Sequence, residues 1–184
     1  MWQEFIEPCA RYVDQQSAHT VSSLTHLVES LSHLIGSYQF VRNDLPYGRY
    51  LVHRDSSDRF NIQLDIFSEN YEGAVHCHQT WGMLGVAKGT LLVEQWQQPG
   101  EGAFCKLGES VLTQGSLQSF CPPVSDWHKV RTLSHGIQVV TFHIYGKGFN
   151  LDEGIYLKPS LEPVKANRSP FKPLAEIAPY IKRG

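Results

Sequence analysis

Short segments rich in β-branched and aromatic residues follow one another from Tyr47 onward, separated by Gly, Pro, Asn, Asp and Ser. Such segments are typical of strands, and such spacers are typical of turns. The pattern predicts strands near residues 49–53, 60–67, 75–86 (with room for a bend), 89–96, 103–107, 110–113, 116–120, 127–132 and 136–146. Because no helical segment intervenes, a parallel α/β sheet is excluded, and we expect a mainly β, small antiparallel jelly-roll barrel.

Helical periodicity belongs to the N-terminal part of the chain. Four apolar residues recur at helical spacing from about residue 20, namely Leu24, Val28, Leu31 and Ile35. Gly36 follows them at a position where a left-handed residue often ends a helix. A first helix is expected from Pro8 to about Gln16, because proline is tolerated in the first turn of a helix. The barrel is therefore expected to be preceded by N-terminal α-helices.

Length and composition favour one domain over residues 1–184, because 41% hydrophobic residues suffice for one core and leave little for a second. We expect a helical segment at 1–40, the barrel at 45–150 and a C-terminal strap at 158–184. The strap contains five prolines, which exclude long regular elements. We expect it to run along the surface, anchored by Phe171, Ile177 and Tyr180.

Net charge and cysteine spacing narrow the classes of partner and the compartment. The formal net charge is −2, with acidic and basic residues interspersed, so no basic surface for nucleic acid or an anionic membrane is expected. No segment approaches the roughly 20 apolar residues of a membrane-spanning helix. The four cysteines are scattered without a C-x-x-C pair, as in a protein with reduced thiols. We expect a cytoplasmic protein that acts on small molecules, and its oligomeric state stays open.

Two histidines one residue apart, His76 and His78, stand in the stretch AVHCHQTWGMLGVAKG. On a strand their side chains share one face, while Cys77 points to the other. The pair predicts two ligands of a metal ion, although a single H-x-H also occurs among structural histidines. His128, in SDWHKVRT, is the best third ligand, because it opens a later strand at a separation where one barrel strand returns beside another.

This arrangement resembles the cupin superfamily, whose first motif is commonly H-x-H, then a glutamate and a later glycine, and whose second motif adds one histidine. Gly89 matches the glycine, but Gly82 and Met83 stand where the glutamate would fall. The ligand set therefore consists of neutral imidazoles. Such a set leaves the full charge on a divalent ion and open positions for a bidentate anionic substrate and O2. Imidazole suits Fe, Zn, Cu and Ni alike, so spacing does not name the ion.

The segment VVTFHIYG places Thr141, His143 and Tyr145 at alternate positions, so their side chains share one face of a strand. A hydroxyl, an imidazole and a phenol in a row can relay a proton or orient a ligand. A solvent-exposed polar face is the alternative. The apolar residues between them disfavour it, because interior polar groups need partners.

Taken in order, HCHQTWGMLGVAKG, DWHKV and TFHIY resemble the thiol dioxygenases, the family of cysteine dioxygenase and 3-mercaptopropionate dioxygenase. The resemblance covers roughly residues 45–150. It implies Fe(II) as the cofactor and five functional residues: the iron ligands His76, His78 and His128, and the outer pair His143 and Tyr145. Thr141 stands where the family usually has serine, and it retains the hydroxyl. Gly82 stands where mammalian cysteine dioxygenases have the cysteine that crosslinks to the tyrosine, so no crosslink is expected.

The stretch PYGRYLV supplies Arg49 at a position that resembles the substrate-carboxylate arginine of cysteine dioxygenases, and Tyr47 shares its strand face. Without the resemblance, Arg49 would be taken for a surface cation. In the 3-mercaptopropionate branch this position is typically glutamine, and an arginine follows later in the chain. No arginine lies between Tyr145 and Leu157, which favours the arginine type although WGMLG resembles the other branch.

The resemblance implies a non-haem Fe(II) thiol dioxygenase that converts a small carboxylated thiol and O2 into a sulfinic acid. Cysteine, 3-mercaptopropionate and mercaptosuccinate all qualify as the thiol. Two alternatives stay open: a three-histidine cupin that cleaves β-diketones or aromatic diols, and a non-catalytic ligand-binding cupin. The second is weakened because the N-terminal helices carry no concentrated basic face for DNA.

Overall fold

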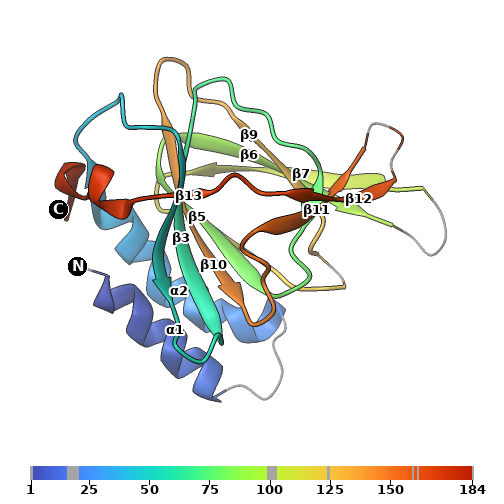
Figure 1. The fold of residues 1–184 in the computed structure, drawn as a ribbon, viewed down its shortest axis with the longest axis horizontal. Helices are drawn as coiled ribbons and strands as arrows, with labels where there is room; N and C mark the ends of the chain where they lie inside the picture. The colour runs from blue at the N-terminus through green and yellow to red at the C-terminus, as the bar shows by residue number, and fades with distance from the viewer. Residues whose placement is uncertain are drawn as a thin grey trace.

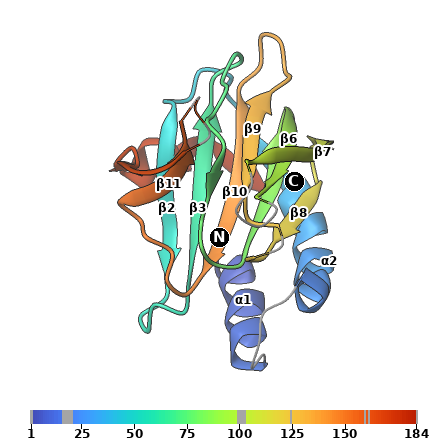
Figure 2. The same cartoon turned by 90° about the vertical axis from the view of Figure 1, so that its right-hand side faces the viewer.

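Two six-stranded sheets face each other, and two helices cover the outer side of one of them (Figures 1 and 2). The computed structural model describes residues 2–15, 21–98, 103–123, 125–158, 160 and 162–183. The β2 sheet has the order β13 (Phe171–Lys172), β2 (Gly48–Arg54), β3 (Phe60–Phe67), β10 (Val139–Gly146), β5 (Gly82–Lys88) and β8 (Leu117–Phe120). The β6 sheet has the order β12 (Pro163–Asn167), β11 (Glu153–Leu157), β4 (His76–Cys77), β9 (His128–Thr132), β6 (Thr90–Gln97) and β7 (Cys105–Thr113).

The chain crosses repeatedly between the sheets, with β3 and β5 in one and β4 and β6 in the other. The pairs within both sheets are antiparallel except for β13 beside β2. Apolar side chains from both sheets meet between them, among them Leu84, Val86, Leu91, Val93 and Val130. This topology confirms the predicted mainly β jelly roll with helices before it.

Most predicted strands are present, and their differences from the prediction have local causes. The expected strands 49–53, 60–67, 89–96, 116–120 and 127–132 correspond to β2, β3, β6, β8 and β9 within one residue at each end. The stretch 75–86 is divided into β4 and β5, because Gln79 has a φ of 60° and leaves the extended conformation. The segments 103–107 and 110–113 form one strand, β7, which pairs with β6 along its whole length through one register shift.

The first helix, α1 (Gln3–Gln15), begins before Pro8, so the expected start at that proline is wrong. Phe5 and Cys9 are fully buried, and Tyr12 is nearly so, which gives α1 a continuous apolar face across the proline. Burial of that face stabilises the turn that precedes Pro8, as tertiary packing does for most helices in proteins. The expected end at Gln16 lies outside the described residues.

The second helix, α2 (Val21–Ser37), matches the predicted periodicity, but Gly36 does not end it. Gly36 lies inside the helix and is not among the residues with positive φ. A Cβ at this position would stand 3.4 Å from Cα of Gly115, in the turn before β8. The glycine therefore serves close packing between α2 and that turn.

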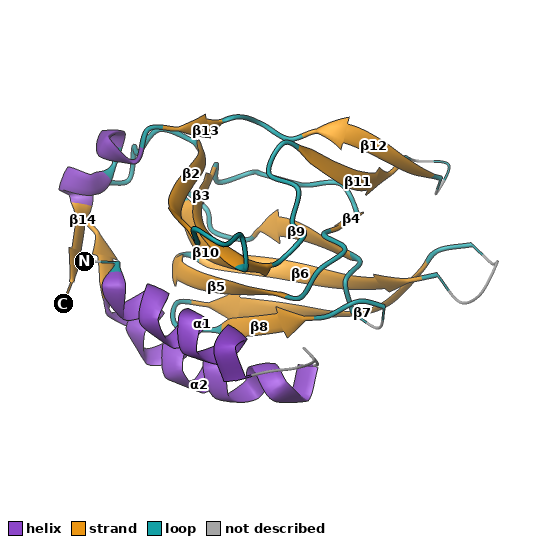
Figure 3. Ribbon diagram, turned by 60° about the horizontal axis from the view of Figure 1, so that its bottom comes forward, coloured by secondary structure: helices purple, strands orange, loops and turns teal. Residues whose placement is uncertain are grey.

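Strand β10 is buried on both faces, which decides where its polar residues lie. On one face, Val140, Phe142 and Ile144 belong to the core cluster that includes both helices. Figure 3 shows α1 and α2 lying along this sheet. The alternate residues of β10 face the space between the sheets. The expected alternative, a polar strand face in solvent, is therefore excluded for β10.

The C-terminal segment forms short elements that were not predicted individually. After β12 the chain adds β13, two 3₁₀ turns at Leu174–Glu176 and Ala178–Tyr180, and β14 (Ile181–Arg183), which pairs with β1 (Tyr38–Phe40). Ile177 between the turns is fully buried, and Phe171 pairs with Arg49 across β13 and β2. Among the helices of the described residues, none is both long and apolar enough to cross a membrane.

Candidate metal centre and its cavity

The turn that follows β4 is held by the carboxylate of Asp126. Oδ1 accepts a hydrogen bond from the backbone N–H of His78 at 2.9 Å, and Oδ2 accepts one from the backbone N–H of Gln79 at 2.6 Å. These bonds stabilise the positive φ of Gln79, which is rare outside glycine. Burial raises the pKa of Asp126 to about 6, and the two hydrogen bonds act in the opposite direction. This structural role of the aspartate in DWH was not predicted from the sequence.

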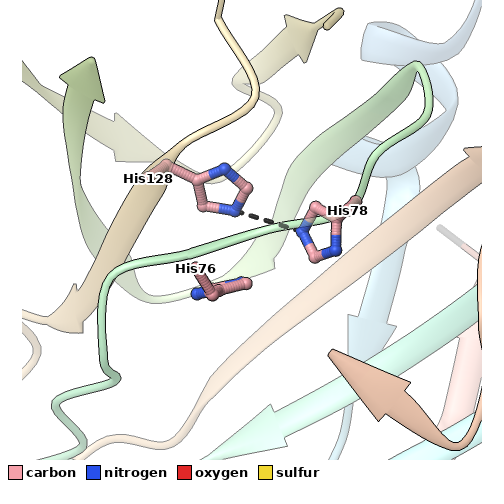
Figure 4. Close-up of side chains that lie close together, drawn as sticks. All are labelled: His76, His78 and His128. Atoms are coloured by element: carbon pink, nitrogen blue, oxygen red, sulfur yellow. Dashed lines mark hydrogen bonds between the residues drawn. The ribbon is translucent and has the colours of Figure 1, made fainter. Parts of the chain in front are cut away.

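The three predicted ligands converge from two strands (Figure 4). His76 on β4 is the Cα partner of His128 on β9, and His78 follows directly after β4. One ring nitrogen from each residue lies within 4.8 Å of the others, and Nε2 of His78 is 3.3 Å from Nε2 of His128. Two imidazoles on one ion with bonds of about 2.1 Å stand roughly 3.0–3.4 Å apart. The three nitrogens could bind one metal ion after a small movement of the rings toward one another.

All three imidazoles are neutral, which is the form that binds metals. Nδ1 of His76 donates to the carbonyl of Ala74 at 2.9 Å, and Nδ1 of His128 donates to that of Asp126 at 3.0 Å, so both Nε2 atoms keep their lone pairs. Burial lowers the pKa of His76 to about 4. Burial, together with repulsion from neighbouring histidines, also lowers the pKa of His78 and of His128 well below its usual value. Within the described part of the chain, no carboxylate joins this cluster.

A cavity of about 520 Å³ opens beside the three histidines, within the size range of small-molecule sites. Apart from the histidine cluster, the polar or charged side chains that line it include Arg49, Gln63, Asp65, His143, Tyr145 and Arg168. The C-terminal stretch 168–172 also lines it. Part of the segment that was expected to be a surface strap therefore forms a wall of the cavity.

Thr141, His143 and Tyr145 form a hydrogen-bonded row on the cavity side of β10. Oγ1 of Thr141 lies 2.8 Å from Nε2 of His143, and the Tyr145 hydroxyl lies 2.9 Å from Nδ1. Burial, assisted by Arg49 and Arg168, lowers the pKa of His143 to about 3, so the imidazole is neutral and donates through only one nitrogen. Burial raises the pKa of Tyr145 far above its usual value, so the phenol keeps its proton. The two hydrogen bonds of the row can therefore run in either direction, from Thr141 to Tyr145 or from Tyr145 to Thr141.

Arg49 is held rigidly at one side of the cavity. Its Nη1 donates to the carbonyls of Ser169 at 2.8 Å and Leu151 at 3.3 Å, and its Nη2 donates to Oε1 of Gln63 at 3.0 Å. The guanidinium also lies over the ring of Phe171, 4.3 Å from its centroid. Burial lowers the pKa of Arg49, and Asp65 partly offsets this effect. Arg49 is thus a partly buried cation facing the cavity and not a surface residue.

Arg168 also reaches the cavity, although it lies outside the arginine-free stretch between Tyr145 and Leu157. Nη2 of Arg168 donates to Nδ1 of His78 at 3.3 Å, and Nε donates to the carbonyl of Glu153 at 2.8 Å. Its guanidinium lies 4.6 Å from the centroid of the Phe149 ring. The cavity therefore has two arginines in its lining, Arg49 and Arg168, although no arginine closely follows Tyr145 in the sequence. No local motif marks Arg168, because it is brought in by the β11–β12 hairpin.

The remaining predicted positions lie around the cavity. Cys77 is buried and does not line it, as expected for a residue on the opposite strand face. Tyr47 precedes β2, is 53% exposed and lines the cavity. At Gly82, a Cβ would stand 2.4 Å from Cε2 of Phe120, so this ring fills the space that a side chain at 82 would need. A crosslink from position 82 is absent because the residue is glycine.

No family model matches the chain. It is similar to an RmlC-like cupin protein from Ralstonia eutropha, with 17% identity, a TM-score of 0.47 and coverage of 70% of this chain and 78% of that chain. It is similar to a cupin 2 conserved barrel domain protein from Rhodopseudomonas palustris, with 14% identity, a TM-score of 0.46 and coverage of 65% and 74%. It is also similar to an RmlC-like cupin family protein with a double-stranded β-helix fold from Methanocaldococcus jannaschii, with 11% identity, a TM-score of 0.44 and coverage of 60% and 88%. At these identities and TM-scores, the likenesses carry no argument about fold, ligand or activity.

Proposed function

We propose that this protein is a thiol dioxygenase of the cupin superfamily, which converts a small carboxylated thiol and O2 into a sulfinic acid. The observation that carries the proposal is a cluster of neutral imidazoles, without a carboxylate, at the wall of a cavity that also contains cationic guanidinium groups. The resemblance of the three sequence motifs supports it, because the motifs contribute this cluster and the hydrogen-bonded row of β10.

Fe(II) is the metal that the proposal assigns to His76, His78 and His128. When bound there, iron supplies positions at which a thiolate and O2 come into contact. Because the three ligands are neutral, the charge of a divalent ion is left for the substrate to compensate. A thiol that carries a carboxylate satisfies this requirement, since its thiolate meets the metal and its carboxylate meets a guanidinium.

Arg49 and Arg168 are the groups that would bind the substrate carboxylate. The hydrogen bond from Arg168 to Nδ1 of His78 requires the proton of that imidazole to be on Nε2. A metal ligand at Nε2 cannot carry this proton, so Arg168 would give up the bond when the site is filled. Its guanidinium would then be available to an anion beside the cluster. Arg49 would hold its position, because three acceptors of the protein fix it.

The row of β10 would supply or accept a proton at the hydroxyl of Tyr145. This ring stands 4.5 Å from the ring of His78, between centroids, so the tyrosine ring borders the cluster, and the residue lines the cavity. When Nδ1 of His143 donates to Tyr145, the phenolic O–H is free for the substrate or for oxygen. When Tyr145 donates to Nδ1, Nε2 donates to Thr141 instead. The row therefore changes direction without forming an imidazolium ion.

The test is oxygen consumption by protein loaded with Fe(II), using cysteine, 3-mercaptopropionate and mercaptosuccinate as thiols. We expect uptake that depends on the thiol and a product heavier than the thiol by the mass of O2. A panel of β-diketones and aromatic diols serves as the comparison. Uptake with that panel and not with the thiols would contradict the proposal, and iron binding without any substrate-dependent uptake would indicate a ligand-binding cupin.

A further inference from the structure

The carboxylate of Asp65 is a buried group with an unsatisfied oxygen in the wall of the cavity. Its Oδ1 has no hydrogen-bond partner among the described residues, and the side chain is 13% exposed. Asp65 lies on β3 between Arg49 on β2 and Thr141 on β10, its Cα partners in the two neighbouring strands. Buried carboxylates in proteins are normally hydrogen-bonded or paired with a cation, so this oxygen requires an explanation.

The arginines of the cavity do not supply the missing partner. The charges of Arg49 and Arg168 both lower the pKa of Asp65. Among the described residues, however, no ion pair joins Asp65 to either arginine. Arg49 donates to three other acceptors, and Arg168 donates to His78 and a backbone carbonyl. The nearest basic atom is Nε2 of His143, 3.6 Å from Oδ2, and this atom already contacts Thr141. Burial outweighs the arginines and raises the pKa of Asp65 to about 6.

We propose that Asp65 determines specificity by accepting a hydrogen bond from an ammonium or hydroxyl group that the substrate carries in addition to its thiol and carboxylate. The inference rests on the proposed function, since it concerns the substrate of the same cavity. Oδ1 is itself buried, so a ligand in the cavity would meet the exposed part of this carboxylate, and rotation about χ2 can exchange the two oxygens there. Among the described residues that line the cavity, Asp65 is the only carboxylate, and it therefore offers the one anionic acceptor there.

The alternative explanation is that Asp65 is a counter-ion that only balances the arginines. A counter-ion would be expected to contact at least one guanidinium directly, in the bidentate geometry that arginine favours. Here the guanidinium of Arg49 is directed to Gln63 and to backbone carbonyls instead. The separation of charges leaves both a cation and an anion free to meet opposite groups of one ligand. A substrate with a carboxylate and a donor group fits both.

Three probes differ at one carbon and separate the possibilities: 3-mercaptopropionate has hydrogen there, 3-mercaptolactate a hydroxyl and cysteine an ammonium. With Fe(II)-loaded wild type we expect kcat/KM to be higher for at least one of the two donor-bearing thiols than for 3-mercaptopropionate. Asp65→Ala should reduce that preference by about 10- to 100-fold, the size expected for loss of a charge-assisted hydrogen bond. Asp65→Asn should reduce the preference for cysteine more than that for 3-mercaptolactate, because an amide oxygen still accepts but carries no charge.

Asp55→Asn is the matched control, because Asp55 is also a buried carboxylate but bonds Arg59 outside the cavity. It should leave the ratios among the three thiols unchanged. Melting of the metal-free proteins should show Asp65→Asn at or above the wild-type temperature, since the change removes a buried charge. Lower activity of this variant would then not result from unfolding.

Calorimetric titration of Zn(II)-loaded protein with the same thiols under anaerobic conditions measures binding without turnover. We expect the same order of preference there and the same loss in Asp65→Ala. Equal losses for all three thiols, or a wild type that prefers neither donor-bearing thiol, would overturn the inference. If no thiol is oxidised but Zn(II)-loaded protein shows the Asp65-dependent preference, the proposed function fails and the role of Asp65 stands.

Discussion

Replacing His143 by glutamine should make the protein less sensitive to acid. The pKa of His143 is lowered from 6.5 to about 3 in the folded protein by burial and by the two arginines. The unfolded chain therefore takes up a proton as the pH falls below 6.5, whereas the folded protein does not until much lower pH, so stability is present at high pH and is lost on acidification. At about pH 5, which lies about 1.5 units below the pKa of the unfolded chain, this protonation lowers the free energy of unfolding by about 2 kcal/mol. His143→Gln removes this contribution.

The assay is urea unfolding of wild type and His143→Gln at about pH 8 and pH 5 in the presence of a chelator. Wild type should lose about 2 kcal/mol more stability than the variant between these values. Asp65, which faces His143, changes stability in the opposite sense in both proteins, so its effect cancels in the comparison. His53→Gln, a histidine of β2 that does not line the cavity, controls for the loss of a histidine elsewhere. Equal pH dependence of stability in wild type and His143→Gln would refute the conclusion that the imidazole of His143 is neutral in the folded protein.

Further substitutions test the cluster, the cation and the packing around them. His128→Ala should abolish iron retention and turnover together, measured by metal analysis after gel filtration, whereas His53→Ala should keep both. Arg49→Ala should reduce kcat/KM for carboxylated thiols by about 10-fold or more while changing turnover of cysteamine much less, and equal losses would reject the clamp. Gly146→Ala would bring a Cβ to 2.1 Å from Nε1 of Trp81, so thermal unfolding should show a loss of about 1–3 kcal/mol. A melting temperature equal to that of wild type would show that Trp81 can move freely.

The strands of the barrel were predictable where they are long and buried. They were less predictable where a segment is a strand only because neighbouring strands pair with it. β3 and β10 have strong apolar content on the helix-facing side, and their pattern was sufficient to locate them. β4 consists of two residues, and it is a strand because β9 and β11 pair with it. β12 is largely exposed, so its strand state depends on β11 and not on its own composition. Local sequence carries little information about such elements.

The ligand cluster was predictable because its geometry follows from strand periodicity. His76 lies on β4, and the register with β9 places His128 opposite it. Asp126 and Arg168 could not be assigned in this way. The first acts through backbone N–H groups of a turn, and the second is carried to the cavity by a hairpin whose position depends on tertiary packing. Both depend on contacts between segments far apart in the chain, which no single motif records.

The charge of the cavity bears on which class of substrate it can accept. Among the described residues that line it, Arg49, Arg168 and Lys172 are cations, and one carboxylate, on Asp65, faces them. The three-histidine cluster adds no negative charge, so a divalent ion would increase the positive excess. An aromatic diol or a β-diketone binds a metal as an anion but offers no second anionic group, and would leave the partly buried guanidinium of Arg49 without an anion in direct contact. A thiol with a carboxylate would compensate the metal and an arginine at once, so the positive excess supports the proposed carboxylated thiol over a diol or a diketone.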